Sequence, residues 1–346
     1  MDKIKEQNRK LACSGEPVFA LRGVLALKSE GELEELRKIA HTEDVAAWLC
    51  EPETMKMLLF ALPSADFELF SKAAEQPFMQ EDEVVLPVHA ALLHFALLQA
   101  YLVEDRLYLV VPTELRELWR DIKRTNFPRK KRLRDKVDGY AQAAVKLYGA
   151  LPFALFCRML KLRGEEAKEQ EIRETLVDLA DGNYFYIEED MLLYPGLNCE
   201  EAKQYLDSRA AFPMYLPSHE KLMRLGDGDY YDVFHELELW RLELEDEMKE
   251  AGDENAAQKA MHFADSLYAV LRTELADESH RELFDYFGIA PDEDRVRKMK
   301  DYTRLWCLFG NTPQELLESV QAGTLRPPVN SPCPCGSGKK FKKCHG

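Results

Sequence analysis

The chain has 346 residues, 46% hydrophobic and 31% charged, so it is long enough and apolar enough to bury the cores of more than one domain. It carries 62 acidic and 46 basic side chains, a formal net charge of −16. A chain this acidic repels nucleic acid and anionic membranes on average, so such contacts require a local basic surface. No window predicts a signal peptide or a membrane span, and we expect a soluble, cytoplasmic protein.

In chain order, the hydrophobic pattern predicts a mainly α protein made of several modules. The predicted parts are an N-terminal helical segment (1–60), a helical and hairpin module A (61–122), a basic linker (123–137), a similar module B (138–200), a C-terminal helical domain (205–325) and a terminal motif (331–346).

Modules A and B resemble two diverged copies of one unit. Ala61-Leu62-Pro63 precedes a helical run in the first, and Ala150-Leu151-Pro152 precedes one in the second. Each module ends in a predicted β-hairpin, at residues 101–112 and 184–195, with β-rich arms, an acidic turn and a closing proline. Helices followed by a hairpin predict two winged-helix-like repeats.

The helices before these hairpins indicate whether the modules suit DNA. The helix predicted at 88–100 is nearly all apolar and should be buried, whereas the one predicted at 165–180 is dominated by Glu and Asp. A helix that enters the major groove needs Arg, Lys, Asn and Gln. We therefore expect the modules to act as a scaffold or in protein contacts.

The strongest basic stretch, residues 116–136, has ten Lys and Arg side chains against three acidic ones, with Trp119 and Phe127 interleaved. This pattern suits contact with a nucleic-acid backbone and stacking on bases. Residues 236–254, with nine acidic and two basic side chains, offer an intramolecular partner of opposite charge instead. The sequence leaves both interpretations open.

The C-terminal helical domain shows two further signals. Leu237, Trp240 and Leu244 fall on one face of a predicted long helix, although Glu and Leu alternate there as in a strand. Thr312 and Glu315 form a predicted capping box, with proline at the first helical position.

The last sixteen residues carry the clearest chemical pattern. Cys333 and Cys335 are separated by one residue, and Cys344 and His345 follow after eight more. Three thiolates and one imidazole make a complete tetrahedral set for Zn²⁺, and with no position left for water the site is structural. So short a segment cannot bury a core, so metal binding must supply its folding free energy, on the order of 10–16 kcal/mol in zinc peptides.

The residues between the two ligand pairs predict a tight turn and a basic surface. Gly336 and Gly338 are expected to make the turn, followed by one short helical turn. Three thiolates with one Zn²⁺ sum to −1, so the knuckle stays positive and is expected to contact ribosomal RNA or an acidic protein face, unless its charges are simply solvated. The predicted partner-binding residues are Lys339, Lys340, Phe341, Lys342 and Lys343.

Residues 332–346 closely resemble the SEC-C motif, the zinc-binding tail of the preprotein translocase ATPase SecA. The resemblance implies zinc ligation by Cys333, Cys335, Cys344 and His345. In SecA this tail docks on the export chaperone SecB and on ribosomes, so the resemblance also implies a docking element. It does not imply translocase activity, because a SecA motor is far longer and has nucleotide-binding motifs that this sequence lacks.

Two other stretches are similar to segments of uncharacterised bacterial SEC-C proteins. One is Tyr215-Leu-Pro-Ser-His-Glu-Lys-Leu followed by Asp227-Gly-Asp-Tyr-Tyr, and the other is Arg304-Leu-Trp306 followed by Gly310-Asn-Thr-Pro-Gln-Glu-Leu316. The similarity implies membership of that group and carries no activity with it.

No catalytic motif is found. His235-Glu236 lacks the second histidine of a zinc protease, and neither a G-x-S-x-G nor a dinucleotide glycine pattern occurs. We therefore expect a non-enzymatic adaptor that docks on a ribosome, chaperone or other protein through its C-terminal knuckle. The alternatives are a nucleic-acid-associated regulator using residues 116–136, and an enzyme whose site is assembled from distant residues.

Overall fold

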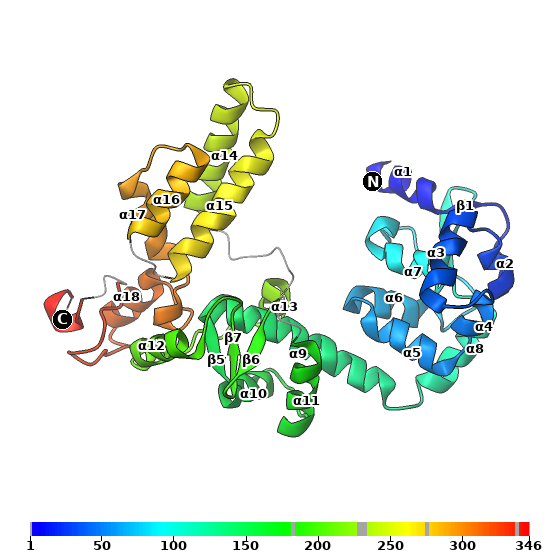
Figure 1. Cartoon of the computed structure of the whole chain (residues 1–346), viewed down its shortest axis with the longest axis horizontal. Coiled ribbons are helices and arrows are strands. Elements are labelled where there is room, and N and C mark those ends of the chain that lie inside the picture. The colour runs from blue at the N-terminus through cyan, green and yellow to red at the C-terminus, as the bar shows by residue number, and fades with distance from the viewer. Residues whose placement is uncertain (1, 181–183, 227–233, 274–276, 336–338, 346) are drawn as a thin grey trace. The chain divides into compact units, whose positions relative to one another are not determined.

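The computed structural model describes residues 2–180, 184–226, 234–273, 277–335 and 339–345. It is 61% helical, and the described residues form 18 α-helices and two small sheets (Figure 1). The prediction of a mainly α protein with two small β-hairpins is confirmed. Among the described residues, no helix is both long and apolar enough to cross a bilayer.

The chain divides into two compact units, residues 1–135 and 136–346, and the boundary along the sequence falls within the long helix α9 (Phe127–Tyr148). The predicted linker at 123–137 thus overlaps a continuous helix of 22 residues.

Unit 1 packs short helices around one apolar core and a four-stranded sheet. The sheet order is β1-β3-β4-β2, with β1 parallel to β3 and the other neighbours antiparallel. Its helices are α1 (Asp2–Leu11), α2 (Leu21–Leu25), α3 (Glu30–Ala40), α4 (Val45–Leu49), α5 (Pro52–Ala61), α6 (Ser64–Ala73), η1 (Leu86–His89), α7 (Ala90–His94) and α8 (Thr113–Ile122). Its strands are β1 (Cys13–Ser14), β2 (Met79–Gln80), β3 (Gln99–Val103) and β4 (Arg106–Val110).

The single buried helix predicted at 88–100 is wrong. Helix α7 ends at His94, Ala96 adopts a left-handed φ of 52°, and Gln99 already begins strand β3. An apolar run is buried equally well as helix or strand, so its periodicity could not locate this break.

Unit 2 begins with a helix, strand, two helices and a hairpin. After α9 come β5 (Ala150–Pro152), α10 (Phe153–Leu162), α11 (Glu169–Leu179), β6 (Tyr186–Glu188) and β7 (Met191–Leu193), with sheet order β5-β7-β6, all antiparallel. This connectivity is the one expected of a winged helix. In unit 2, strand β5 precedes α10, the helix that follows Ala150-Leu-Pro152. In unit 1, strand β2 follows α6, the helix after Ala61-Leu-Pro63, so the two modules differ and the winged-helix-like repeat stays a prediction.

Both hairpins close with the same two-residue turn. Glu104-Asp105 and Glu189-Asp190 all have φ between 46° and 63°, the left-handed conformation that a type I′ turn requires. Asp105 pairs with Arg9 at 2.6 Å, and Asp190 pairs with Arg173 at the same distance. The turns that would face a nucleic-acid backbone are therefore acidic and already hold cations of their own unit.

The rest of unit 2 is helical. Its elements are α12 (Cys199–Arg209), α13 (His219–Gly226), α14 (His235–Glu250), α15 (Ala256–Thr273), α16 (Asp277–Phe287), α17 (Glu293–Tyr302), η2 (Trp306–Leu308), α18 (Pro313–Gln321) and η3 (Phe341–Lys343). The predicted long helix is α14, which buries Leu237, Trp240 and Leu244 and lies beside α15 (Figure 1). The predicted capping box at Thr312 and Glu315 is present at the start of α18.

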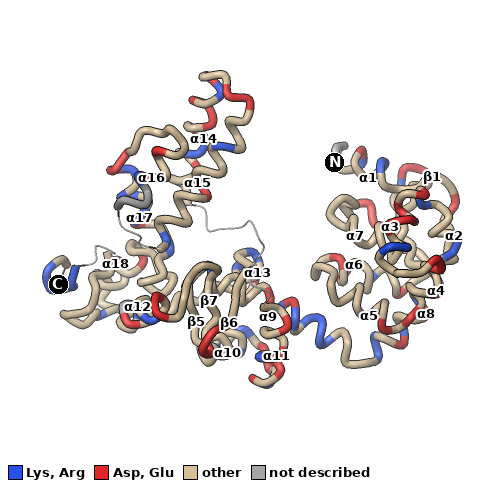
Figure 2. Tube along the Cα trace, viewed as in Figure 1, with Lys and Arg blue, Asp and Glu red and all other residues tan. Residues whose placement is uncertain are grey.

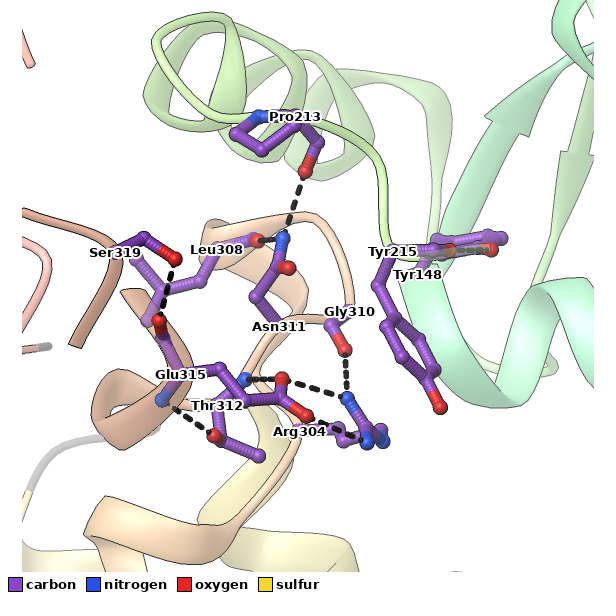
Figure 3. Close-up of polar contacts among 10 residues, drawn as sticks. All are labelled: Tyr148, Pro213, Tyr215, Arg304, Leu308, Gly310, Asn311, Thr312, Glu315 and Ser319. Atoms are coloured by element: carbon purple, nitrogen blue, oxygen red, sulfur yellow. Dashed lines mark hydrogen bonds and ion pairs between the residues drawn. The ribbon is translucent and has the colours of Figure 1, made fainter. Parts of the chain in front are cut away.

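The two stretches that resemble other SEC-C proteins meet in space (Figure 3). Arg304 is buried, donates to both carboxylate oxygens of Glu315 at 3.0 Å and stacks on the Tyr215 ring at 3.5 Å. Asn311 donates to the Pro213 carbonyl oxygen at 2.7 Å. These contacts hold residues 213–217 against residues 304–316, so the side chains have a structural role in unit 2. The Asp227–Tyr231 part of the first stretch lies outside the described residues.

Candidate metal centre

The four predicted ligands come together at the C-terminal end of the chain. The ligand atoms of Cys333, Cys335, Cys344 and His345 all lie within 4.8 Å of one another. The Sγ atoms of Cys335 and Cys344 are 3.5 Å apart, and Cys333 Sγ is 3.2 Å from His345 Nδ1. A soft donor set this compact is a candidate metal-binding site.

Backbone hydrogen bonds position the two ligand pairs. The N–H of Cys333 donates to the Lys339 carbonyl at 2.7 Å, next to an isolated antiparallel bridge between Pro332 and Lys340. The 3₁₀ turn η3 follows, and both Cys344 and His345 donate their N–H groups to the Phe341 carbonyl at 3.0 Å. This turn returns the second ligand pair to the first.

Residues before the ligands complete the small fold. Phe341 N–H donates to the Ser331 carbonyl at 2.9 Å, and Lys342 N–H donates to the Val329 carbonyl at 3.1 Å. The sequence pattern did not reveal this contribution, because it uses backbone groups that any residue would provide. Gly336 and Gly338, predicted to form the tight turn, lie outside the described residues.

The ligands differ in exposure. Cys333 is fully buried, Cys335 is half-buried, and Cys344 and His345 are exposed. Burial raises the pKa of the Cys333 thiol to about 12, so a metal ion that binds there must displace a firmly held proton.

The predicted partner-binding residues lie on the surface of this knuckle. Phe341 is half-buried, and the lysines around it are exposed, so that the C-terminal end is basic (Figure 2). These exposed lysines are Lys339, Lys340, Lys342 and Lys343.

The basic stretch at 116–136 is only partly available to a partner. Lys131 is fully buried and donates to Asp135 and to the Leu62 carbonyl, both at 2.5 Å. Lys123 pairs with Glu75 at 2.7 Å, and Lys136 lies 3.4 Å from Glu165. Within the described part of this stretch, the exposed basic side chains for which no ion pair is found are Arg120, Lys130 and Arg132.

The acidic stretch at 236–254 pairs largely with cations of its own neighbourhood. Arg241 binds Glu238 at 2.6 Å and Glu245 at 2.9 Å, both on α14. Arg295 of α17 binds Glu243 at 2.6 Å and stacks on the Trp240 ring. Part of the negative charge of α14 is thus compensated within the C-terminal helices.

A cleft of about 650 Å³ lies in unit 1, between α1 and the turn of the first hairpin. Its lining residues are Ile4, Lys5, Asp82, Glu83, Glu104, Asp105 and Arg106. Lys5 approaches Asp105 to 3.4 Å, and Asp82 accepts the Leu107 N–H at 2.9 Å. The lining offers no cysteine, serine or histidine for nucleophilic chemistry.

Comparison with known proteins agrees with the geometry of the tail. The model of the SEC-C motif matches residues 330–346, so the chain carries a SEC-C motif. The SecA translocase subunit of Campylobacter lari is 51% identical over 39 residues, which are 11% of this chain and 4% of that protein. A SecA of Thermobifida fusca is 84% identical over 19 residues, 6% of this chain and 2% of that one.

This chain is not SecA itself, because it spans only a few per cent of the length of the SecA relatives and matches only their tail. A UPF0225 protein of Pectobacterium carotovorum is 28% identical over 116 residues, 34% of this chain and 72% of that protein. No solved structure matches the chain.

Proposed function

We propose that the chain is a non-enzymatic, zinc-binding adaptor of the cytoplasm that docks on a large partner through its C-terminal knuckle. The observation that carries the proposal is the grouping of four ligand atoms within 4.8 Å in a short basic tail. The partner class is a ribosome, a chaperone or another large protein assembly with an acidic face.

The geometry supports zinc as the ion. A tetrahedral zinc ion with bonds of about 2.3 Å to sulfur and 2.0–2.1 Å to nitrogen separates its ligand atoms by about 3.5–3.8 Å. The S–S distance of 3.5 Å and the S–N distance of 3.2 Å are close to those separations. All four positions are supplied by the chain, which leaves none for a catalytic water and favours a structural role.

The charge of the tail supports docking. With zinc bound, three thiolates and the ion contribute −1 and the four lysines contribute +4, on a chain whose net charge is −16. This contrast concentrates attraction for a negatively charged partner at the knuckle, and such attraction weakens as salt screens it.

Two experiments test the proposal. Elemental analysis of purified protein should find about one zinc per chain, and Cys344→Ser should lose it, since three protein ligands hold a structural ion poorly.

Deleting residues 331–346 should leave the helical circular dichroism intact and abolish co-sedimentation with ribosomes. The matched control replaces Lys339, Lys340, Lys342 and Lys343 with Gln, which should keep the zinc and weaken sedimentation. Undiminished sedimentation of the deleted chain would refute docking through the knuckle.

A second candidate function is nucleic-acid association through the exposed Arg120, Lys130 and Arg132. Fluorescence anisotropy with a labelled RNA at low salt should then detect binding that falls steeply as salt rises. Replacing these three residues with Gln should remove that binding, and no binding by the wild-type chain excludes this function. The acidic helix α11 and the acidic hairpin turns argue against it.

A further inference from the structure

Two of the four candidate ligands form a sulfur pair that solvent can reach. Cys335 Sγ and Cys344 Sγ are 3.5 Å apart, while Cys344 is exposed and Cys335 is half-buried. A disulfide bond is about 2.05 Å long, so the two sulfurs need to approach by only about 1.5 Å. Cys344 follows the single 3₁₀ turn η3 and is the next-to-last described residue, so this small shift is expected to disturb little of the unit.

We infer that the Cys335–Cys344 pair is an oxidation site, at which hydrogen peroxide converts the two thiolates to a disulfide and thereby releases the metal ion. The inference rests on the zinc site proposed above and adds a regulation of it. Oxidation would remove two of four donors, and Cys333 and His345 alone are too few to hold the ion.

The chemistry balances with one peroxide and two protons. The exposed Cys344 thiolate attacks one oxygen of the peroxide, the O–O bond breaks, hydroxide leaves and a sulfenic acid forms. The Cys335 thiolate then attacks this sulfur, the S–S bond forms and a second hydroxide leaves. Two protons convert both hydroxides to water. The two sulfurs lose two electrons, the peroxide gains them, and Zn²⁺ keeps its charge as it departs.

Differences in burial explain why peroxide should oxidise Cys335 and Cys344 before the other cysteines. Cys333 is fully buried and lies 3.2 Å from His345 Nδ1, so a peroxide reaches it last. Cys157, Cys199 and Cys307 are also buried, and burial raises the pKa of the Cys157 thiol to about 11, which suppresses its thiolate. Cys50 is exposed like Cys344, and it provides the reference thiol.

The test uses the full-length, metal-loaded protein and hydrogen peroxide. A chromogenic chelator should record release of about one zinc per disulfide formed, and peptide mass mapping without reduction should locate that disulfide between residues 335 and 344. A thiol reductant with added zinc should restore the original protein. Cys50 should show no internal disulfide in the same sample.

Two variants separate the inference from simple loss of the site. Cys333→Ser weakens the metal site but should still form the 335–344 disulfide. The double variant Cys333→Ser with Cys335→Ser should form no disulfide and should accumulate sulfenic acid on Cys344, trapped by dimedone, because no second thiolate remains in the site. A disulfide that includes Cys333, or zinc release with both residues 335 and 344 still reduced, would overturn the inference. If the purified protein holds no metal, the zinc proposal fails by itself, and disulfide mapping still decides on the oxidation site.

Discussion

Arg304 and Glu315 show how a polar pair holds together two segments of unit 2. Burial alone would raise the pKa of the Glu315 carboxyl, but hydrogen bonds from Arg304 and from the backbone and side chain of Thr312 outweigh it and hold this pKa below its ordinary value. A carboxyl whose pKa is lowered by folding stabilises the folded state above its ordinary pKa, and this stability is lost as the pH falls through the folded value.

The stability of unit 2 should therefore fall in acid partly through Glu315. Replacing Glu315 with Gln should lower the urea midpoint at pH 7 and should make the further decline below about pH 4.3 shallower than in the wild type. Urea titrations followed by circular dichroism between pH 7 and pH 3 measure both effects. Glu318→Gln is the control, because it makes the same charge change at an exposed position of α18. Parallel pH curves for wild type and Glu315→Gln would contradict this assignment.

At the scale of elements, the hairpin turns carry a conformational cost. Glu189 and Asp190 have φ values of 46° and 61°, which most side chains tolerate poorly and which Asn and Gly adopt readily. The paired replacement Glu189→Asn with Asp190→Gly should raise the free energy of unfolding of unit 2 by about 1 kcal/mol, measured by urea titration.

The control for this change is Asp190→Ser, which removes the ion pair with Arg173 and keeps in the turn a side chain that does not favour the left-handed conformation. The pair is solvent-exposed, with 38% and 72% of the two side chains accessible, so its loss should change stability by less than about 0.5 kcal/mol. A paired variant no more stable than Asp190→Ser would show that the turn is not strained.

The hairpins, α14 and the cap of α18 were predictable because each depends on a local pattern. Alternating β-rich arms around an acidic turn, a helical stripe of Leu237, Trp240 and Leu244, and the Thr312–Glu315 spacing each act within a few residues. The end of α7 at His94 depends on sheet partners instead, since Tyr101 pairs with Cys13, far away in the sequence. No local pattern reports such a pairing.

The metal ligands were predictable for the same reason, since all four lie within thirteen residues of one another. The buried contact of Arg304 with Tyr215 was not, because 89 residues separate them. Sequence similarity had singled out both segments without indicating that they touch. Neither the local sequence pattern nor the sequence similarity predicts the partner of the knuckle. Exposed lysines indicate that the partner surface is negatively charged, but they do not indicate its shape.

At the scale of the whole molecule, the two units bury separate hydrophobic clusters. Leu36 is fully buried in the core of unit 1, and Arg304 is buried in unit 2. Because each unit has a core of its own, each should unfold as its own cooperative transition. Leu36→Ala should destabilise unit 1 by about 2–5 kcal/mol. Arg304→Ala should destabilise unit 2 by about 1–3 kcal/mol, because it removes a buried side chain that stacks on Tyr215 and bonds Glu315, whose own side chain is 43% exposed and keeps its Thr312 donor.

Differential scanning calorimetry of the full chain tests this independence. Each variant should move one melting transition to lower temperature and leave the other in place, and the double variant should show both shifts in full, since substitutions without shared partners add. Arg297→Ala, at an exposed ion pair with Asp294, should move neither. If Leu36→Ala shifted both transitions together, the two units would unfold as one cooperative unit and their independence would be refuted.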